Sequence, residues 1–347
     1  MMRIGRFGAA LLLALGLGSA QARVEGELAP GLVNPGAHEQ PAWFKQSFLD
    51  MREDVGEARA QGKRVMLYFY QDGCPYCAKL LRDNFAQSTL SDATRRYFDV
   101  IAINMWGDRE VTDFEGRKTT EKRFAKMLKV MFTPTVLLLD GDGNVALRIN
   151  GYFPPHRFLA AIRYVGEGLD AKETFREYLA RTSPEPASGQ LHHLPGELQP
   201  PYRLQATLKR DPRPLLVLFE QRQCGDCDEL HDVVFKRPET QRLLKRFQVV
   251  ILDMWAATPL TTPDGRHTTV AAWASALKVD YAPSMVFFDR EGRKVFATGG
   301  YLRAFHVQSA LDYVASGAYL RQPEFQRYIE TRADALRAKG VKVDIWR

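Results

Sequence analysis

The amino-acid sequence predicts an α/β protein of two tandem domains, each a central mixed β-sheet flanked by helices. Three observations predict this fold class. The chain repeats itself about halfway along, each copy carries a Cys-x-x-Cys motif where a strand leads into a helix, and each copy has a later proline before an apolar strand and a hairpin. A chain of 347 residues also exceeds what one hydrophobic core usually serves.

The repeat is visible when the sequence is aligned with itself. At a shift of 150 residues, Cys74, Cys77, Leu80 and Phe85 fall on Cys224, Cys227, Leu230 and Phe235. At a shift of 149 residues, Met105, Trp106, Gly116, Arg117, Lys129, Pro134 and Gly151 fall on Met254, Trp255, Gly265, Arg266, Lys278, Pro283 and Gly300. One single-residue gap near residue 102 reconciles the two shifts. The chain is therefore a duplication, and each copy is long enough to own a core.

Within the first copy, hydrophobic periodicity and turn residues predict the order of the elements. The expected elements are a helix over Pro41–Gln61, a strand over Val65–Tyr70, a helix continuing from Cys77, a strand over Val100–Ile103, a helix over Glu121–Lys129, and a hairpin of Val136–Leu139 with Val145–Ile149. A last helix contains Phe158, Ile162 and Val165. The second copy repeats this order.

The chain begins with a predicted signal peptide over residues 1–22. Arg3 and Arg6 precede an apolar stretch, Phe7–Gly18, that is too short to span a membrane, and cleavage is expected after Ala22. We therefore expect an exported, periplasmic protein. Its expected parts are a first domain over 38–181, a linker over 182–202 that is rich in proline and glycine, and a second domain over 203–340.

The charge pattern and the glycine pattern limit the partners. The formal net charge of +7 is spread among acidic and basic residues with no run of five like charges, which argues against nucleic acid as a partner. No glycine-rich dinucleotide loop follows a predicted strand, so we expect no nicotinamide or flavin cofactor. A membrane or periplasmic electron donor is the expected partner if the protein passes on electrons.

The four cysteines, Cys74, Cys77, Cys224 and Cys227, form two pairs with identical spacing. A disulfide that closes a two-residue loop removes little entropy from the unfolded chain, so these pairs are better suited to chemistry than to stapling a fold. A cysteine at a helix N-terminus has a lowered thiol pKa. We expect the first cysteine of each pair to be the nucleophile and the second to resolve the mixed disulfide.

A strand leading into Cys-x-x-Cys, a later strand and helix, and a proline before a hairpin together resemble the thioredoxin fold. Three segments are similar, more narrowly, to the periplasmic thioredoxins associated with sulfur oxidation: Cys74-Pro75-Tyr76-Cys77, Asn104-Met105-Trp106-Gly107-Asp108 and Phe132-Thr133-Pro134-Thr135. The resemblance covers residues 38–170 closely and 203–320 more loosely. It implies two thioredoxin-like domains and a thiol–disulfide oxidoreductase that exchanges disulfides with client proteins or small thiols.

The resemblance also implies that Pro134 and Pro283 are cis-prolines that face the cysteines. The residues before them, Thr133 and Ala282, would then offer backbone groups to a bound client strand. Two departures from the family stand beside this expectation. Gly73 and Gln223 precede the first cysteines, where classical thioredoxins have tryptophan, and Tyr68 and Leu218 replace a buried carboxylate. The resemblance therefore does not imply whether the protein reduces or oxidises its partners.

The second motif differs in charge from the first. Asp226, Asp228 and Glu229 crowd the start of its helix, where they oppose a neighbouring thiolate. We expect Cys224 and Cys227 to be slower and more reducing, as a specialised relay or a partly retired copy.

For several other polar and aromatic residues, both a functional and a purely structural role are possible. His231 lies four residues after Cys227, which allows a metal site with the cysteines, but a surface histidine is favoured. His192 and His193 are expected to be solvated, and Trp106 and Trp255 to pack rather than line a groove. The alternative function is a copper or zinc chaperone, or a client-binding scaffold, that uses the same cysteines.

Overall fold

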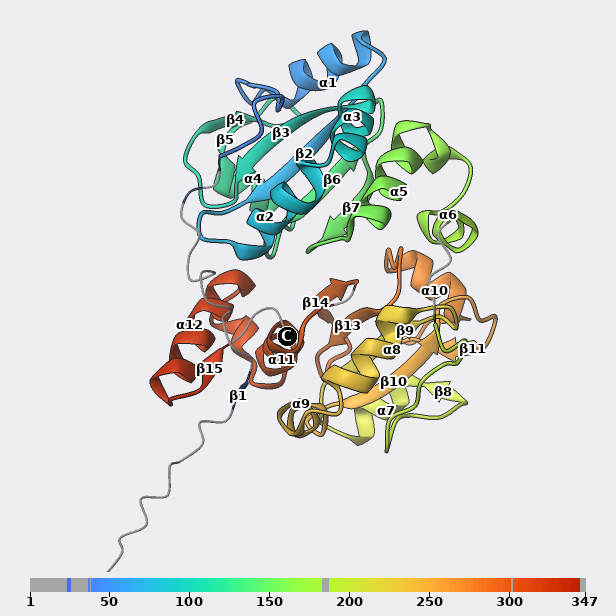
Figure 1. The fold of residues 1–347 in the computed structure, drawn as a ribbon. Helices are drawn as coiled ribbons and strands as arrows, with labels where there is room; N and C mark the ends of the chain where they lie inside the picture. Colours follow the sequence, from blue (N-terminus) through green and yellow to red (C-terminus); the bar gives the residue numbers. More distant parts are fainter. Residues whose placement is uncertain (1–23, 26–36, 38, 183–186, 301, 344–347) are drawn as a thin grey trace, which may run out of the picture.

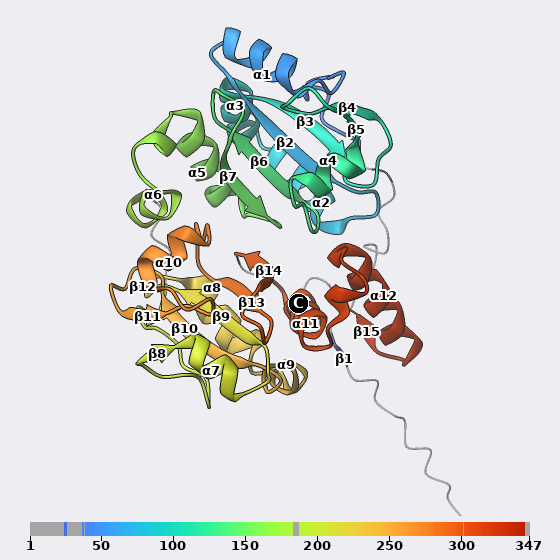
Figure 2. The same cartoon turned by 180° about the vertical axis from the view of Figure 1, so that it is seen from behind.

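The computed structural model describes residues 24–25, 37, 39–182, 187–300 and 302–343, so the predicted signal peptide lies outside the described residues. Two α/β domains, one from each copy, lie one above the other in Figure 1 and, seen from behind, in Figure 2. This confirms the predicted fold class. Within the described ranges, no helix is long and apolar enough to cross a membrane.

The first domain is built on a mixed four-stranded sheet. Its strands lie in the order β3 (Phe98–Asn104), β2 (Arg64–Tyr70), β6 (Thr135–Leu139) and β7 (Val145–Asn150). Strand β2 runs parallel to β3 and antiparallel to β6. Alternate β2 side chains enter two separate buried clusters, Met66 on one face and Leu67 on the other. Both faces are covered, which explains why this strand is apolar throughout.

Helices cover the two faces of this sheet. The helical elements are α1 (Met51–Ala60), α2 (Pro75–Leu80), a π-helix (Leu81–Phe85), α3 (Ser88–Tyr97), α4 (Glu121–Met127), α5 (Pro155–Gly166), a 3-10 helix (Leu169–Ala171) and α6 (Phe175–Thr182). Residues of α1 and α4 share one buried cluster, and residues of α2, α3 and α5 share the other. A short hairpin of β4 (Glu110–Thr112) and β5 (Lys118–Thr120) follows β3.

The predicted helix over Pro41–Gln61 is wrong in its first half. The helix begins only at Met51, where the Asp50 carboxylate accepts hydrogen bonds from the first backbone N–H groups. Before it, the Lys45 N–H donates to the carbonyl of Val100 at 2.8 Å, and Phe44 is buried. The aromatic spacing that indicated a helix therefore reflects core contacts made by a non-helical segment.

The second domain repeats the arrangement of the first. Its sheet has the order β10 (Gln248–Asp253), β9 (Leu215–Glu220), β13 (Ser284–Phe288) and β14 (Lys294–Gly299). The helical elements are α7 (Leu204–Arg210), α8 (Gly225–Glu229), a π-helix (Leu230–Val234), α9 (Pro238–Leu244), α10 (Val270–Ala276), α11 (Ala304–Ala315), a 3-10 helix (Ala318–Leu320) and α12 (Phe325–Ala338). The short strands are β8 (Tyr202–Arg203), β11 (Pro259–Thr261), β12 (His267–Thr269), and β15 (Lys342–Val343), which pairs with β1 (Val24–Glu25).

Of the predicted linker, Thr182 ends α6 and Tyr202 begins β8, and residues 187–201 contain no helix or strand. These residues nevertheless lie fixed on the second domain. The Leu198 N–H donates to the carbonyl of Val249 at 2.7 Å, and the Ser188 N–H donates to the Asp228 carboxylate at 2.7 Å. This segment is therefore part of the second domain's surface.

The two domains meet through a pair of exchanged aromatic side chains. Phe132, which precedes the Thr133–Pro134 bond, packs into the second domain against Phe325. Its counterpart in the repeat, Tyr281, packs into the first domain, with its ring centroid 4.9 Å from that of Phe153. Because each domain donates the same position to the other, the contact has approximate two-fold symmetry.

Candidate functional site: two facing disulfide clefts

Each Cys-x-x-Cys motif begins a helix at the end of a central strand. Cys74 is the N-cap of α2, and its sulfur accepts a hydrogen bond from the Cys77 N–H at 3.1 Å. Cys224 caps α8 in the same way, at the same distance from the Cys227 N–H. Both pairs are disulfides. The second cysteine of each pair is fully buried, and its resolving role stays a prediction.

The turn before Cys74 explains one departure from the family pattern. Gly73 has a φ of 72°, a left-handed conformation that disfavours residues with a side chain. The tryptophan of classical thioredoxins would be strained at this position. Tyr68, at the family's carboxylate position, is fully buried with no hydrogen-bond partner for its hydroxyl, and burial raises its pKa. It is therefore not a proton acceptor for Cys77.

The structure brings the predicted site residues together in two groups. The Thr133–Pro134 and Ala282–Pro283 bonds are both cis, as the resemblance implied. Thr133 lines the same cleft as Cys74, and Ala282 lines the same cleft as Cys224. The Thr133 hydroxyl is buried and has no hydrogen-bond partner among the residues that the structure describes.

Each cleft is closed by the other domain. The Cys74 cleft has a volume of about 820 Å³, and its far wall comes from α11 and α12, including His306 and Ile329. The Cys224 cleft, of about 370 Å³, is lined on its far side by Arg176 and Leu179 of α6. Cys74 is only 4 % exposed and Cys224 only 3 %. Protein clients therefore do not reach either sulfur in this arrangement.

The third residue of each motif contacts the opposite domain at equivalent positions. The Tyr76 ring lies edge-on to His306, with centroids 5.0 Å apart. In the other direction, Asp226 forms an ion pair of 2.5 Å with Arg157. Arg157 and His306 occupy the same place in α5 and α11 and are matched by the repeat. Arg157 also lines both clefts.

Comparison with known families fits this geometry. A model described as the thioredoxin-like domain matches residues 51–166 and again residues 194–315. The chain belongs to this thioredoxin-like family. It carries two copies of the domain in tandem, each with its own disulfide.

Three individual proteins each match less than half of the chain. The thiol:disulfide interchange protein DsbD of Colwellia psychrerythraea is 25% identical over 130 residues, which are 36% of this chain and 20% of the relative. The chain thus matches about a fifth of that protein's length. A thioredoxin-fold protein from Helicobacter pylori is 25% identical, with a TM-score of 0.33, over 40% of this chain and 86% of the other. A thioredoxin from Thermus thermophilus is 26% identical, with a TM-score of 0.27, over 34% and 84%.

The tryptophans of the two thioredoxin-like domains both make polar contacts, and Trp255 also borders a cleft. Trp106 donates its indole N–H to Gln71 at 2.7 Å, and Trp255 donates to Gln221 at 2.9 Å. A guanidinium from the opposite domain lies 4.7 Å from the centre of each ring. Trp255 lines the Cys224 cleft, so the expectation that it only packs is incomplete.

The acidic residues around Cys224 are each held by a partner. Asp226 pairs with Arg157, Asp228 accepts from Ser188, and Glu229 forms a 2.7 Å ion pair with Arg303. These contacts offset part of the negative charge that we expected to oppose a thiolate at Cys224. We predicted that Cys224 and Cys227 react more slowly and are more reducing than the first pair. The electrostatic argument for that prediction is therefore weaker.

Two titratable groups that sequence reasoning missed lie in the clefts. Asp280 lines the Cys224 cleft, and burial raises the pKa of its carboxyl to about 6. His306 lines the Cys74 cleft, and burial, with a smaller effect of Arg332, lowers its pKa to about 4. Neither has a counterpart of the same type in the other copy, where Met131 and Arg157 stand, so the repeat gave no signal for them.

The expectation that His231 lies on the surface is wrong. It is 7 % exposed, and its Nε2 lies 2.6 Å from the Oε1 atom of Glu220, which is fully buried. His192, which we expected to be solvated, also contacts Glu220. His193 is exposed, as predicted. The available signal was a glutamate at the end of an apolar strand, where the first copy has Tyr70.

Proposed function

We propose that this protein is an exported thiol–disulfide oxidoreductase that exchanges disulfides with protein or small-thiol partners through both of its cysteine pairs. The observation that carries the proposal is the placement of each disulfide. Each begins a helix, shares a cleft with the residue before a cis-proline, and has its second cysteine fully buried.

The chemistry of the oxidised form follows from this placement. A partner thiolate attacks the Sγ of Cys74, the Cys74–Cys77 bond breaks, and its electron pair leaves with Cys77 as a thiolate. A second partner thiol, as thiolate, then attacks the mixed disulfide. The partner is released as a disulfide, and Cys74 leaves as a thiolate held at the positive end of α2. Two electrons thereby pass to the motif, and the reverse sequence reduces a partner.

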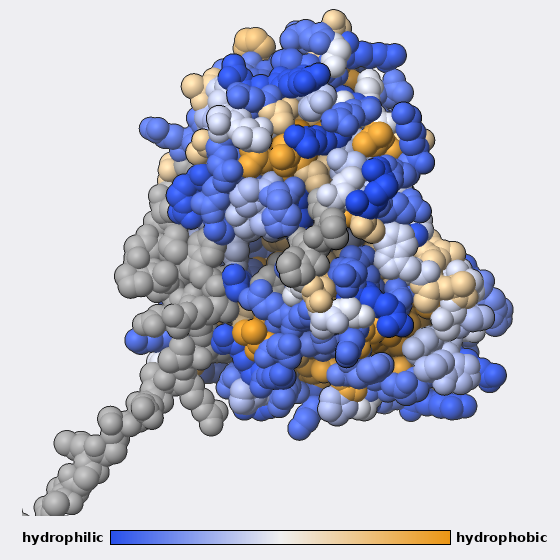
Figure 3. Space-filling view, turned by 45° about the vertical axis from the view of Figure 1, so that its right-hand side comes forward, coloured by the Kyte–Doolittle hydropathy of each residue, from blue (hydrophilic) through white to orange (hydrophobic). Residues whose placement is uncertain are grey.

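Because each cleft is closed by the other domain, the size of a partner decides whether it reaches the cysteines. A small thiol has room in the 820 Å³ cleft beside Cys74, whereas a client protein needs the two domains to separate. Large apolar side chains that are exposed among the described residues are scattered: Phe48, Met127, Val145, Val233 and Leu320. The face drawn in Figure 3 is likewise mostly hydrophilic. The clefts, rather than an outer apolar face, are thus the proposed client-binding surfaces.

The proposed cellular setting is the periplasm, with electrons supplied by a separate donor. The signal-like residues 1–22 support this setting, and the similarity to a thiol:disulfide interchange protein supports disulfide exchange there. The predicted absence of a dinucleotide-binding loop supports the need for a donor.

Turnover of a model client tests the proposal. Purified protein is incubated with insulin and dithiothreitol, and insulin reduction is followed by turbidity against the uncatalysed rate. We expect catalysis by the wild type, a reduced rate for Cys74→Ser and for Cys224→Ser, and the uncatalysed rate for the double variant. Equal rates for the wild type and the double variant would overturn the proposal.

A further inference from the structure

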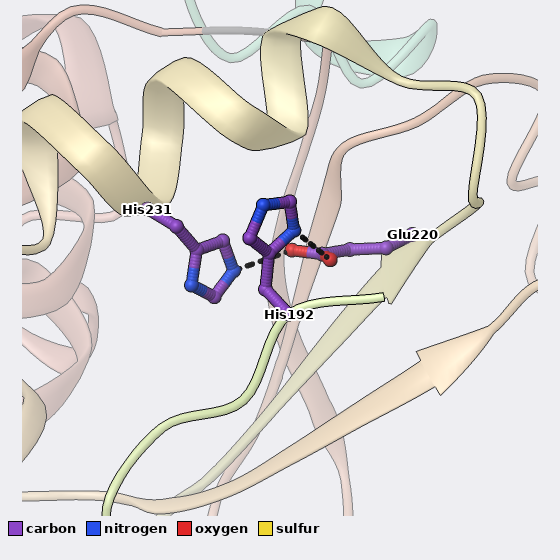
Figure 4. A group of neighbouring side chains, drawn as sticks. All are labelled: His192, Glu220 and His231. Carbon is purple, nitrogen blue, oxygen red and sulfur yellow. Dashed lines mark hydrogen bonds and ion pairs between the residues drawn. The ribbon is translucent and has the colours of Figure 1, made fainter. Parts of the chain in front are cut away.

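The second domain contains a cluster of two histidines and one glutamate (Figure 4). Glu220 ends strand β9, His231 lies on the π-helix that continues α8, and His192 comes from the linker. Glu220 Oε1 is 2.6 Å from His231 Nε2, and Glu220 Oε2 is 3.1 Å from His192 Nδ1. Figure 4 shows both rings presenting a nitrogen to the same carboxylate.

The cluster is a feature of the second domain alone. The repeat matches Glu220 with Tyr70 and His231 with Leu81. In the first domain, Leu81 packs against the hydrophobic core, so the fold does not require polar groups there. The second domain has thus replaced an apolar pair with a carboxylate and an imidazole, in a buried place where such groups are costly unless they have partners.

Both ring nitrogens of His192 contact carboxylates, which indicates a positive charge at this place. Its Nδ1 faces Glu220, and its Nε2 lies 3.0 Å from a carboxylate oxygen of Asp228. A neutral imidazole has one N–H and donates only once, so it matches one of these two carboxylates and leaves the other facing a lone pair. Among the described residues, the ion pairs of Glu220 are with His192 and His231, and none is with a lysine or arginine. A positive charge at the Nδ1 position would satisfy both contacts.

We propose that His192 Nδ1, Glu220 and His231 Nε2 bind one divalent transition-metal ion, for which Zn²⁺ is the best match. All three ligand atoms lie within 4.8 Å of one another. Tetrahedral zinc holds nitrogen and oxygen ligands at about 2.0–2.2 Å, so its ligand atoms are roughly 3.3 Å apart. The two Glu220 contacts, at 2.6 and 3.1 Å, are close to that spacing.

The outer contacts fit a metal site. Metal-binding histidines usually donate their second ring N–H to a carboxylate, which fixes the ring. Asp228 is placed to accept this N–H from His192, with its Oδ1 3.0 Å from Nε2, and it also accepts from the Ser188 hydroxyl at 2.6 Å. The rings of His192 and His231 are stacked, with centroids 4.3 Å apart and planes 12° from parallel, so one ring has to rotate before both nitrogens reach the same ion. Three protein ligands leave a fourth position for water.

The bound ion would hold the linker against α8 and the π-helix that continues it. His192 belongs to the linker, whereas Asp228 follows Cys227 directly and His231 lies one turn later. A metal at this place therefore joins the segment that connects the domains to the element that carries Cys224 and Cys227.

Zinc titration of the oxidised protein tests the site, because closed disulfides offer no thiolate ligands. The full chain is treated with chelator, dialysed, and titrated with ZnCl₂ against a chromophoric competitor. We expect one equivalent of zinc to bind, and the affinity to fall at least about 100-fold in His192→Ala and His231→Ala. The control is His193→Ala, an exposed neighbour outside the cluster, which should bind like the wild type.

Hydrogen–deuterium exchange separates this site from binding elsewhere. Zinc should slow exchange of backbone amides over residues 188–198 in the wild type and in His193→Ala, but not in His192→Ala. His192→Ala changes only a linker residue, so this variant still tests the site if His231→Ala fails to fold. No saturable binding below about 10 μM zinc, or equal affinity in wild type and His192→Ala, would overturn the proposal. The His192 contacts would then belong to an imidazolium.

Discussion

Thr133 holds a buried hydroxyl with no hydrogen-bond partner beside the first disulfide. A buried unpaired hydroxyl costs folding free energy, and its repeat counterpart is the apolar Ala282. The neighbouring Thr135 differs, because its hydroxyl donates to the Phe132 carbonyl at 2.8 Å. The two threonines therefore form a matched pair for mutation.

We expect Thr133→Val to leave the free energy of unfolding unchanged or to raise it by about 1 kcal/mol, since no hydrogen bond is lost. Thr135→Val should lower it by about 1 kcal/mol, because a carbonyl loses its donor. Denaturant unfolding of both variants measures the difference. In the proposed function, Thr133→Val should also change exchange with insulin more than exchange with a small thiol. A clear destabilisation by Thr133→Val would show that its hydroxyl has a partner.

Asp280 gives a pH-dependent prediction at the same scale. Burial raises the pKa of its carboxyl from 3.8 to about 6, so the folded protein binds an extra proton between these values. Stability contributed by this group is therefore present at low pH and is lost as pH rises through 6. We expect Asp280→Asn to stabilise the protein at pH 7.5 by on the order of 1–2 kcal/mol, allowing for solvent screening.

Thermal unfolding at pH 7.5 and pH 3.5 checks this prediction. At pH 3.5 the carboxyl is mostly protonated in both states, so the gain from Asp280→Asn should nearly vanish. The exposed Asp334→Asn is the control and should change stability little at either pH. A gain of equal size at both pH values would contradict the ionisation argument.

At the scale of elements, local patterns predicted most of the structure. The strands before each motif, the helices that begin at Cys74 and Cys224, and the hairpins after each proline all depend on neighbouring residues. The helix over Pro41–Gln61 was half wrong because Phe44 is held by contacts with distant residues, such as Phe85. The buried His231 was missed because its partners, Glu220 and His192, lie 11 and 39 positions away in the sequence.

Helix α5 carries Arg157, which lines both clefts. Arg157→Ala removes its ion pair with Asp226 and should weaken the closing of the domains. We expect dithiothreitol to reduce Cys224–Cys227 about tenfold faster in this variant. This corresponds to a loss of about 1.4 kcal/mol from the free energy of domain closure. Quenched alkylation followed by peptide mass measurement gives the rate.

Arg163→Ala is the matched control, because Arg163 lies on the exposed side of the same helix. It should leave the reduction rate unchanged. Equal rates in wild type and Arg157→Ala would mean that this ion pair does not restrict access to the second disulfide.

At the scale of the whole molecule, the duplication has produced two sites that cover each other. The exchange of Phe132 and Tyr281, and the paired contacts of Tyr76 with His306 and Asp226 with Arg157, place both motifs at one interface. The sequence predicted the two domains but not this arrangement. Contacts between domains depend on side chains without a local pattern, so periodicity and turn residues carry no information about them.

The most direct test of the account is an equilibrium redox titration of the whole protein. Samples equilibrated at defined thiol–disulfide ratios are quenched with acid and alkylated, and the Cys74–Cys77 and Cys224–Cys227 peptides are quantified separately by mass. The account predicts that both pairs titrate reversibly, each with its own midpoint potential. If neither pair exchanges with the buffer, the claim that these are two redox-active sites is contradicted.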